Sequence, residues 1–259
     1  MHNQNKCSSI VVAVMLLFTV QACKKEAQTN SQTVVHNEIV FNTKLSYGSV
    51  KDIDGNSYKT IVIGTQTWTA ENLKVKKYSN GDAIANLLDT AWNTTRTGAY
   101  CDIFDKPLSV DSIYGRLYNG YAVLDARNLC PSGWHVPSDS DFTILSLYLG
   151  GASVAGNKLQ EIGKNHWNMS SSKVKNETGF TALPAGSRGP SKGAEFANQT
   201  AAASWWTSTP LQNATGEINY WQLANAEDSI NQFTSDVYMS DGKHGDSKVM
   251  GLSVRCIKN

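Results

Sequence analysis

The chain has 259 residues, of which 41% are hydrophobic, 9% aromatic and 17% charged, and its formal net charge is +1. Soluble domains average about 25% charged residues, so the polarity of this chain must come from its many Asn, Ser, Thr and Gly residues. A near-neutral surface of uncharged hydrogen-bonding groups gives no electrostatic grip on a phosphate backbone, which argues against a nucleic-acid partner. The apolar content also argues against a disordered protein.

The first 23 residues carry the pattern of a bacterial lipoprotein signal. One cation, Lys6, precedes an almost unbroken apolar run over Ile10–Val20, which is too short to span a bilayer comfortably and has the length of a signal-peptide core. The segment ends in VQAC, which resembles the lipobox, where the sulfur of the cysteine, here Cys23, receives the diacylglycerol. An ordinary signal peptide or a membrane anchor that ends in cysteine is the alternative.

This pattern sets the expected domain organisation. We assign residues 1–22 to the signal peptide, 23–47 to the lipidated cysteine and a polar tether, and 48–259 to one folded domain. Two or three acyl chains on Cys23 would make the membrane the first partner of the protein. We therefore expect a lipid-anchored protein of the bacterial cell envelope, at the outer membrane, with exposure at the cell surface as a further option.

The cysteines fit an oxidising compartment. Of five cysteines, Cys7 leaves with the signal peptide and Cys23 carries lipid, so that Cys101, Cys130 and Cys256 remain. Three thiols allow three single pairings, each with one cysteine left over. The sequence contains no CxxC and no histidine at ligand spacing, so a zinc site has little support.

The first half of the domain predicts a hairpin, a helix and a short strand. Val50–Trp68 indicates two strands around the turn at residues 54–56. Tyr114–Ala126 has apolar residues at helical spacing and predicts a helix with Gly120 as its weak point. Leu129–Pro137 then indicates a turn that leads into a short strand.

A second helix and a series of strands complete the prediction. Residues 138–141, SDSD, are typical of a capping box, and the apolar stripe of Phe142, Leu145 and Leu149 ends at two glycines. From Gly179 onward, short β-type segments alternate with Gly, Asn and Ser. Helices grouped early and strands grouped late predict an α+β fold with a small antiparallel sheet, two or more helices and long loops.

Eight motifs occur in order across residues 50–257 and resemble the Fibrobacter succinogenes major paralogous domain family. They are DIDGNSYKTIVIGTQTWTAENLK, GAYC, YGRLYNGYAV, LCPSGWHVPSDSDF, LGGASVAGNKL, NETGFTALPAGSR, WWTST and GLSVRC. The family commonly has Trp where this chain has Gly120, and often Met where it has Thr69, which could loosen local packing without challenging the fold.

The architecture of that family is similar, more distantly, to C-type-lectin-like and formylglycine-generating-enzyme (sulfatase-modifying-factor) folds. The resemblance implies that the N- and C-terminal strands pair and that long central loops carry binding. It also implies that the terminal strand returns to the body of the domain, which favours a disulfide between Cys130 and Cys256 and leaves Cys101 as a buried thiol. Pairings of Cys101 with either partner remain open.

No motif supports catalysis. Formylglycine-generating enzymes use two closely spaced cysteines late in the chain, whereas this sequence has only Cys256 after position 130. A GxSxG elbow and a GxxxxGK[ST] phosphate loop are absent, and His135, His166 and His244 are scattered. We therefore expect a protein that is not an enzyme and that needs no cofactor.

The late strands supply the candidate ligand-binding residues, which are Trp205, Trp206, Tyr220 and Trp221. Aromatic faces cover the apolar side of sugar rings, and the neighbouring Asn, Asp and Gln side chains bind hydroxyls. A place for these aromatic residues in the core is the competing interpretation, since the adjacent Trp205 and Trp206 point to opposite faces of a strand.

A bound cation has little support. The lectin-type calcium triplets are absent, so a calcium ion has no motif behind it. Asp236, Asp241 and Asp246 in a Gly-containing loop could hold a cation, but solvated turn carboxylates are the interpretation we favour.

The leading hypothesis is an envelope-anchored lipoprotein with a non-catalytic lectin-like domain that binds a glycan or a surface protein. The first alternative is a structural surface or envelope protein without a specific small ligand. The second alternative, which we favour less, is an enzyme of the formylglycine-generating-enzyme-like class.

Overall fold

The computed structural model describes residues 38–103, 111–170, 172–189, 196–210, 217–224, 228–234 and 247–259. The chain divides into two units, residues 1–34 and 35–259, and every described residue belongs to the second. The predicted lipidation site Cys23 and the loop carboxylates Asp236, Asp241 and Asp246 lie outside the described residues.

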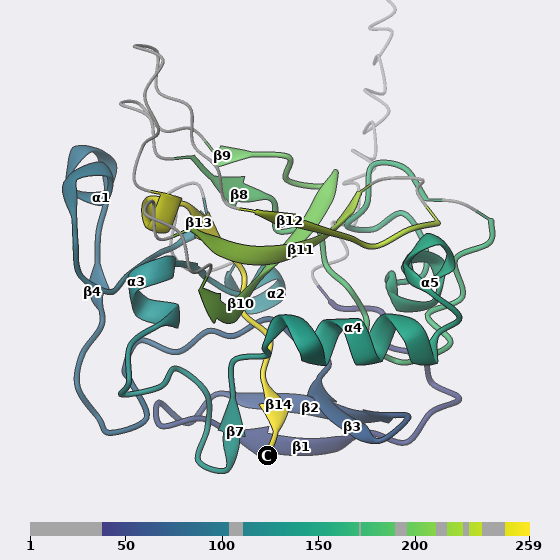
Figure 1. Cartoon of the computed structure of the whole chain (residues 1–259). Helices are drawn as coiled ribbons and strands as arrows, with labels where there is room; N and C mark the ends of the chain where they lie inside the picture. The colour runs from purple at the N-terminus through teal and green to yellow at the C-terminus, as the bar shows by residue number, and fades with distance from the viewer. Residues whose placement is uncertain are drawn as a thin grey trace, which may run out of the picture. The chain divides into compact units, whose positions relative to one another are not determined.

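Three small sheets build the domain (Figure 1). The first contains, in spatial order, β1 (Gly48–Lys51), β2 (Ser57–Ile63), β3 (Gln66–Thr69), β14 (Ile257–Lys258) and β7 (Trp134–His135). The second contains β10 (Ala202–Pro210), β11 (Ile218–Ala224) and β12 (Asn231–Thr234). The third contains β4 (Ala85–Asn86), β5 (Ala99–Cys101), β6 (Leu117–Asn119), β13 (Gly251–Leu252), β8 (Ser187–Arg188) and β9 (Phe196–Ala197).

All strand pairs are antiparallel except β4 with β5. The described helices are short: α1 (Asp89–Thr94), α2 (Asp111–Tyr114), α3 (Gly120–Val123), α4 (Asp139–Tyr148), α5 (Ala152–Leu159) and a 3₁₀ turn at Ser247–Val249. The α+β class is therefore confirmed. The N-terminal hairpin of β1 and β2 is confirmed as well, with Val50 opposite Tyr58, and a second turn at residues 64–65 adds β3 to it.

Helix α4 forms where its sequence signals predict it. The Ser138 side chain accepts a hydrogen bond from the backbone N–H of Asp141, whose carboxylate accepts one from the backbone N–H of Ser138. This capping box satisfies amides that the first helical turn leaves unpaired. The buried Phe142 ring lies 5.1 Å from Trp68 of β3 and 5.7 Å from Trp221 of β11, so that α4 packs between the first and second sheets (Figure 1).

The prediction of a single helix over Tyr114–Ala126 is wrong. Helix α2 ends at Tyr114, β6 occupies Leu117–Asn119, and α3 begins only at Gly120. Gly115 adopts a φ of +75°, which interrupts the helical path, and β6 lies inside the third sheet between β5 and β13 with all its residues buried. Strand pairing on both sides of β6 outweighs the helical preference of this segment. A short run of apolar residues is as compatible with a buried strand as with a helix.

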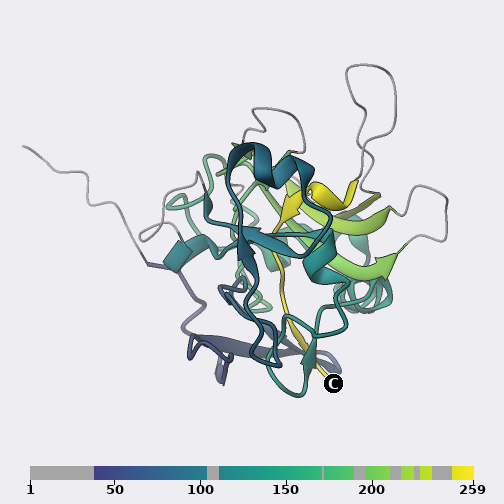
Figure 2. The same ribbon diagram turned by 90° about the vertical axis from the view of Figure 1, so that its left-hand side faces the viewer.

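The C-terminal segment connects all three sheets (Figure 2). β13 pairs with β6 and β8, and β14 pairs with β3 and β7. Between them, the backbone of Ser253 donates to the carbonyl of Ser204 and accepts from the N–H of Trp206, both in β10. Among the described strands, the C-terminal strand β14 lies in the same sheet as the first strand, β1, but it pairs with β3 and β7, so the expected direct pairing of the N- and C-terminal strands is not found.

The disulfide between Cys130 and Cys256 is confirmed, with the two Cα atoms 5.8 Å apart. It fixes the C-terminal segment to the turn before β7 and closes a loop with a sequence separation of 126 residues. Cys101 is buried in β5 and lies outside this disulfide.

We predict that Cys256→Ala lowers the stability of the domain much more than Cys101→Ala. Both sulfurs are buried, but only the first change opens a loop of 126 residues, whose closure is worth about 5 kcal/mol by the chain-entropy model. Thermal unfolding of both variants under non-reducing conditions measures the difference. Equal melting temperatures would show that the disulfide does not constrain the unfolded chain.

Candidate functional site

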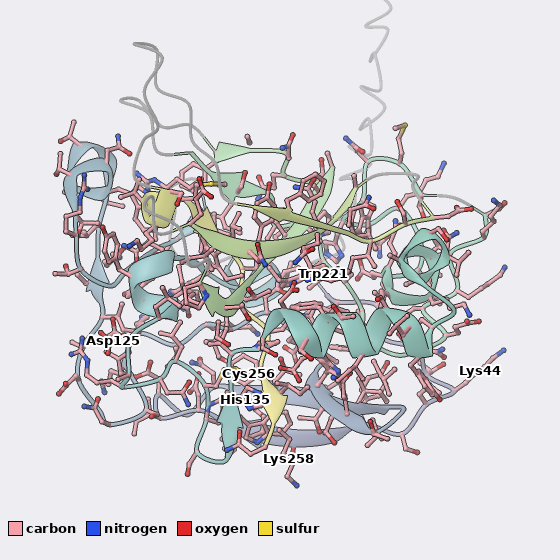
Figure 3. The ribbon with its side chains drawn as sticks, viewed as in Figure 1. Lys44, Asp125, His135, Trp221, Cys256 and Lys258 are labelled. Carbon is pink, nitrogen blue, oxygen red and sulfur yellow. A yellow bond between two sulfur atoms is a disulfide. The ribbon has the colours of Figure 1, made fainter. Side chains whose placement is uncertain are left out.

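Three of the four predicted ligand-binding residues belong to the core. Trp205 and Trp206 are fully buried, and Trp221 is 5% exposed and stacks on Phe142 beside α4 (Figure 3). Their indole N–H groups donate within the domain, to Asn72 Oδ1, the carbonyl of Tyr118 and Asp139 Oδ1, respectively. The exposed aromatic surface expected from these tryptophans is therefore not present in the described fold.

Tyr220 keeps a partly exposed position. It lies opposite Phe233 in the β11–β12 pair, and the two rings stack 5.5 Å apart with Phe233 41% exposed. Gln222, on the same face of β11, donates to Ser204 Oγ. This face offers a small aromatic platform.

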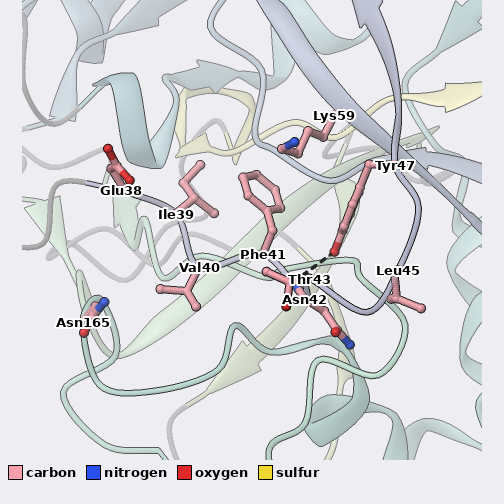
Figure 4. A pocket seen from close by; sticks show the side chains of 10 residues that line it. All are labelled: Glu38, Ile39, Val40, Phe41, Asn42, Thr43, Leu45, Tyr47, Lys59 and Asn165. Carbon is pink, nitrogen blue, oxygen red and sulfur yellow. Dashed lines mark hydrogen bonds between the residues drawn. The ribbon is translucent and has the colours of Figure 1, made fainter.

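A pocket of about 660 Å³ lies at the start of the described chain (Figure 4). Two separate parts of the fold meet there. Residues 38–47 form most of the wall, Lys59 of β2 and Asn165 form the rest, and the lining residues are Glu38, Ile39, Val40, Phe41, Asn42, Thr43, Leu45, Tyr47, Lys59 and Asn165. The volume falls within the roughly 300–1,000 Å³ typical of small-molecule sites.

Residues 38–47, which the sequence assigns to the tether, pack against the domain instead, and we call them the N-terminal strap. The backbone N–H of Val40 donates to Glu161 Oε1 at 2.7 Å, and Asn42 Nδ2 donates to the carbonyl of Asn176 at 3.0 Å. The N–H of Asn42 also donates to the hydroxyl of Tyr47 (Figure 4). Two hydrogen bonds, at Val40 and Asn42, thus join the strap to the rest of the domain, and a third forms within the strap.

Two aromatic rings and one cation dominate the pocket. Phe41 and Tyr47 make an edge-to-face pair with centroids 5.4 Å apart. The ammonium of Lys59 lies 5.1 Å from the Phe41 centroid and 5.6 Å from that of Tyr47. Both distances permit a cation–π attraction. The side chain of Lys59 reaches the rings because β2 presents it on an exposed face next to the strap.

A buried glutamate–histidine pair lies next to the strap, and its glutamate accepts a hydrogen bond from the strap. Glu161 and His166 are both almost fully buried, and His166 Nδ1 lies 2.7 Å from Glu161 Oε2. The ring of Tyr114 meets the imidazole edge-on at 5.4 Å. Burial raises the pKa of Tyr114 to about 12, and the charge of Glu161 adds to this effect. The Glu161 carboxylate therefore contacts two groups at once, the backbone N–H of Val40 in the strap and the imidazole of His166.

The pocket lining combines apolar with polar and charged groups. The ring faces and Val40 offer apolar contact, while Thr43, Asn165, Glu38 and Lys59 offer a hydroxyl, an amide, a carboxylate and an ammonium. Within the described ranges, no group of three or more His, Cys, Asp or Glu side chains is placed to hold a metal ion. None of the helices that the structure describes has the length and apolarity to cross a membrane.

Fold and pocket together define a disulfide-closed α+β domain of three curled sheets with a ligand-sized pocket beside its N-terminal strap. Residues 61–258 match the family model described as Fibrobacter succinogenes major domain (Fib_succ_major), and the chain belongs to this family. Comparisons with curated proteins and with solved structures found no match.

Sequence patterns indicate this pocket only weakly. Phe41 and Tyr47 were visible as aromatic residues in a polar segment, but a segment without periodicity predicts a linker. Glu161 and Asn176, which hold the strap, lie more than a hundred residues further along the chain. The aromatic pair within the predicted tether is the one usable signal.

We predict that Glu161→Ala destabilises the domain by about 3 kcal/mol, because the Val40 N–H and the buried imidazole of His166 lose their partner. Amide hydrogen exchange at Val40 should accelerate as the strap loosens. Glu177→Ala is the matched control, since that carboxylate is half exposed and pairs with Lys158 at 3.4 Å, which is worth less than about 1 kcal/mol. Unchanged exchange at Val40 would contradict the role given to Glu161.

Proposed function

We propose that the chain is an envelope-anchored lipoprotein whose domain binds a glycan or protein ligand without catalysing a reaction. The observation that carries this proposal is the pocket beside the N-terminal strap. It combines two aromatic rings with hydroxyl, amide and charged groups, which is the mixture that polar ligands with apolar faces require. Its lining supplies no histidine or cysteine for acid–base or nucleophilic chemistry.

The fold supports the same proposal in a second way. A C-type-lectin-like arrangement places the chain termini in one sheet and leaves the connections free for binding. The pairing of β3 with β14 is consistent with such an arrangement. The exposed stack of Tyr220 and Phe233 would then be an accessory contact on another part of the domain.

We predict that Cys23→Ser abolishes lipidation and releases the protein from the membrane fraction. The acyl chains on Cys23 are the proposed anchor, and a serine hydroxyl does not replace the sulfur that receives the diacylglycerol. Metabolic labelling of cells with a clickable fatty acid, followed by fractionation, measures both effects. Equal labelling of wild type and variant would refute the lipobox assignment.

For ligand binding, we predict that the unlipidated mature chain, residues 24–259, binds members of a glycan and envelope-protein array and that Phe41→Leu weakens this binding about tenfold. Leucine keeps the apolar packing of the strap but removes the ring face. Tyr148→Ala, which removes an exposed ring outside the pocket, is the control.

Two outcomes of this experiment would count against the proposed site. A loss of binding in Phe233→Ala but not in Phe41→Leu would move the site to the face of β11 and β12. Silence of the whole array at high protein concentration would contradict the binding function itself and favour a structural role in the envelope.

A further inference from the structure

The ammonium of Lys59 differs from several other cations of the domain in having no carboxylate partner among the described residues. Lys74, Lys77, Arg116, Arg127, Lys158 and Lys173 all form ion pairs with carboxylates. Lys59 takes part in none of the ion pairs found among the described residues, and its nitrogen lies over the rings of Phe41 and Tyr47 instead. A cation without a carboxylate partner is therefore held at the pocket.

The backbone that carries this cation is held within its sheet, and two aromatic rings attract its ammonium. The backbone N–H of Lys59 donates to Glu71 Oε1 at 2.7 Å, and its strand pairs with both β1 and β3. The two rings attract the ammonium but accept no conventional hydrogen bond from it, so its N–H donors stay available. Ordering a lysine side chain upon binding costs conformational entropy, and the attraction of the rings reduces that cost.

The other pocket groups point to a ligand rich in hydroxyls. Thr43, Asn165 and Glu38 line the pocket, and none of their side chains has a described hydrogen-bond partner. The carboxylate of Glu38 and the ammonium of Lys59 come from different walls (Figure 4). An anion on the ligand is therefore favoured at one place, beside Lys59, while the remaining groups suit uncharged hydroxyls.

We propose that this pocket binds an acidic saccharide, whose anionic group pairs with the Lys59 ammonium while its hydroxyls contact Thr43, Asn165 and Glu38. The inference rests on the proposed binding function and names its ligand class. A lysine is a point charge that accepts a carboxylate, a sulfate or a phosphate alike, so the shared feature is a sugar ring that carries an anion.

The test uses the purified full-length lipoprotein in detergent and three probes, with affinities measured by calorimetry. Tetragalacturonate carries carboxylates, its methyl ester has the same rings without charge, and a sulfated tetrasaccharide separates sulfate from carboxylate recognition. At least one acidic probe should bind about tenfold more tightly than the ester, and its affinity should fall as salt is added.

Three variants test which residues cause the preference for an acidic ligand. Lys59→Met keeps the apolar stem and should weaken acidic binding about tenfold while leaving the ester unaffected. Glu38→Gln removes the negative charge of the pocket and should strengthen acidic binding. Lys51→Met, at an exposed lysine of β1 outside this pocket, should change nothing. Matching melting temperatures for the variants confirm that the fold is retained.

The possible outcomes distinguish a failure of the acidic-ligand inference from a failure of the proposed binding function. If the ester binds as well as the acid, or Lys59→Met binds the acid normally, the acidic-ligand inference is overturned. The proposed binding function still holds in that case if Phe41→Leu weakens the binding of the neutral ligand. Failure of every acidic probe at millimolar concentration also overturns the inference, and silence on the full array removes the binding function as well.

Discussion

The domain is organised around one buried cation, the guanidinium of Arg255. It is fully buried and donates to Asn72 Oδ1 and to the carbonyls of Thr69, Phe180 and Thr181. Burial lowers the pKa of Arg255 to about 9, and the negative charge of Glu71 opposes that shift, so the group is still charged at neutral pH. Burying a charge is tolerated only when its donors are satisfied, so these acceptors must be in place for the fold to close.

The position of Arg255 in the chain explains why so many elements depend on it. The residue lies between β13 and β14, in the segment that connects three sheets, and next to the disulfide at Cys256. Its acceptors come from the end of β3 and from the loop at residues 180–181, while Asn72 also accepts from the indole of Trp205. The tryptophans predicted as a ligand surface are thus part of the packing around this cation, whose centre lies 5.9 Å from the Trp205 ring.

Local signals predicted the parts of the fold that local interactions decide. The capping box at Ser138 and the hairpin turn before β2 each form from neighbouring residues. The disulfide followed from the family resemblance. The predictions of a helix over 114–126 and of exposed tryptophans are wrong, because distant partners decide which segments are buried between sheets. The same apolar pattern is compatible with a helix and with a buried strand. Gly120 shows the same limit: a Cβ there would lie 2.5 Å from Ile218, a contact that sequence spacing does not reveal.

The strap relates the candidate site to the proposed anchor. Glu38, the first lining residue of the pocket, follows Cys23 by 15 positions, and a fully extended chain of that length spans at most about 50 Å. A lipid on Cys23 would therefore keep the pocket within that distance of the membrane surface. Because residues 38–47 line the pocket, a ligand of a protein lipidated at Cys23 would have to come within that distance of the membrane surface. A polymer that extends away from that surface, with anionic groups spaced along it, satisfies this geometric condition, whereas a ligand confined to more distant layers does not.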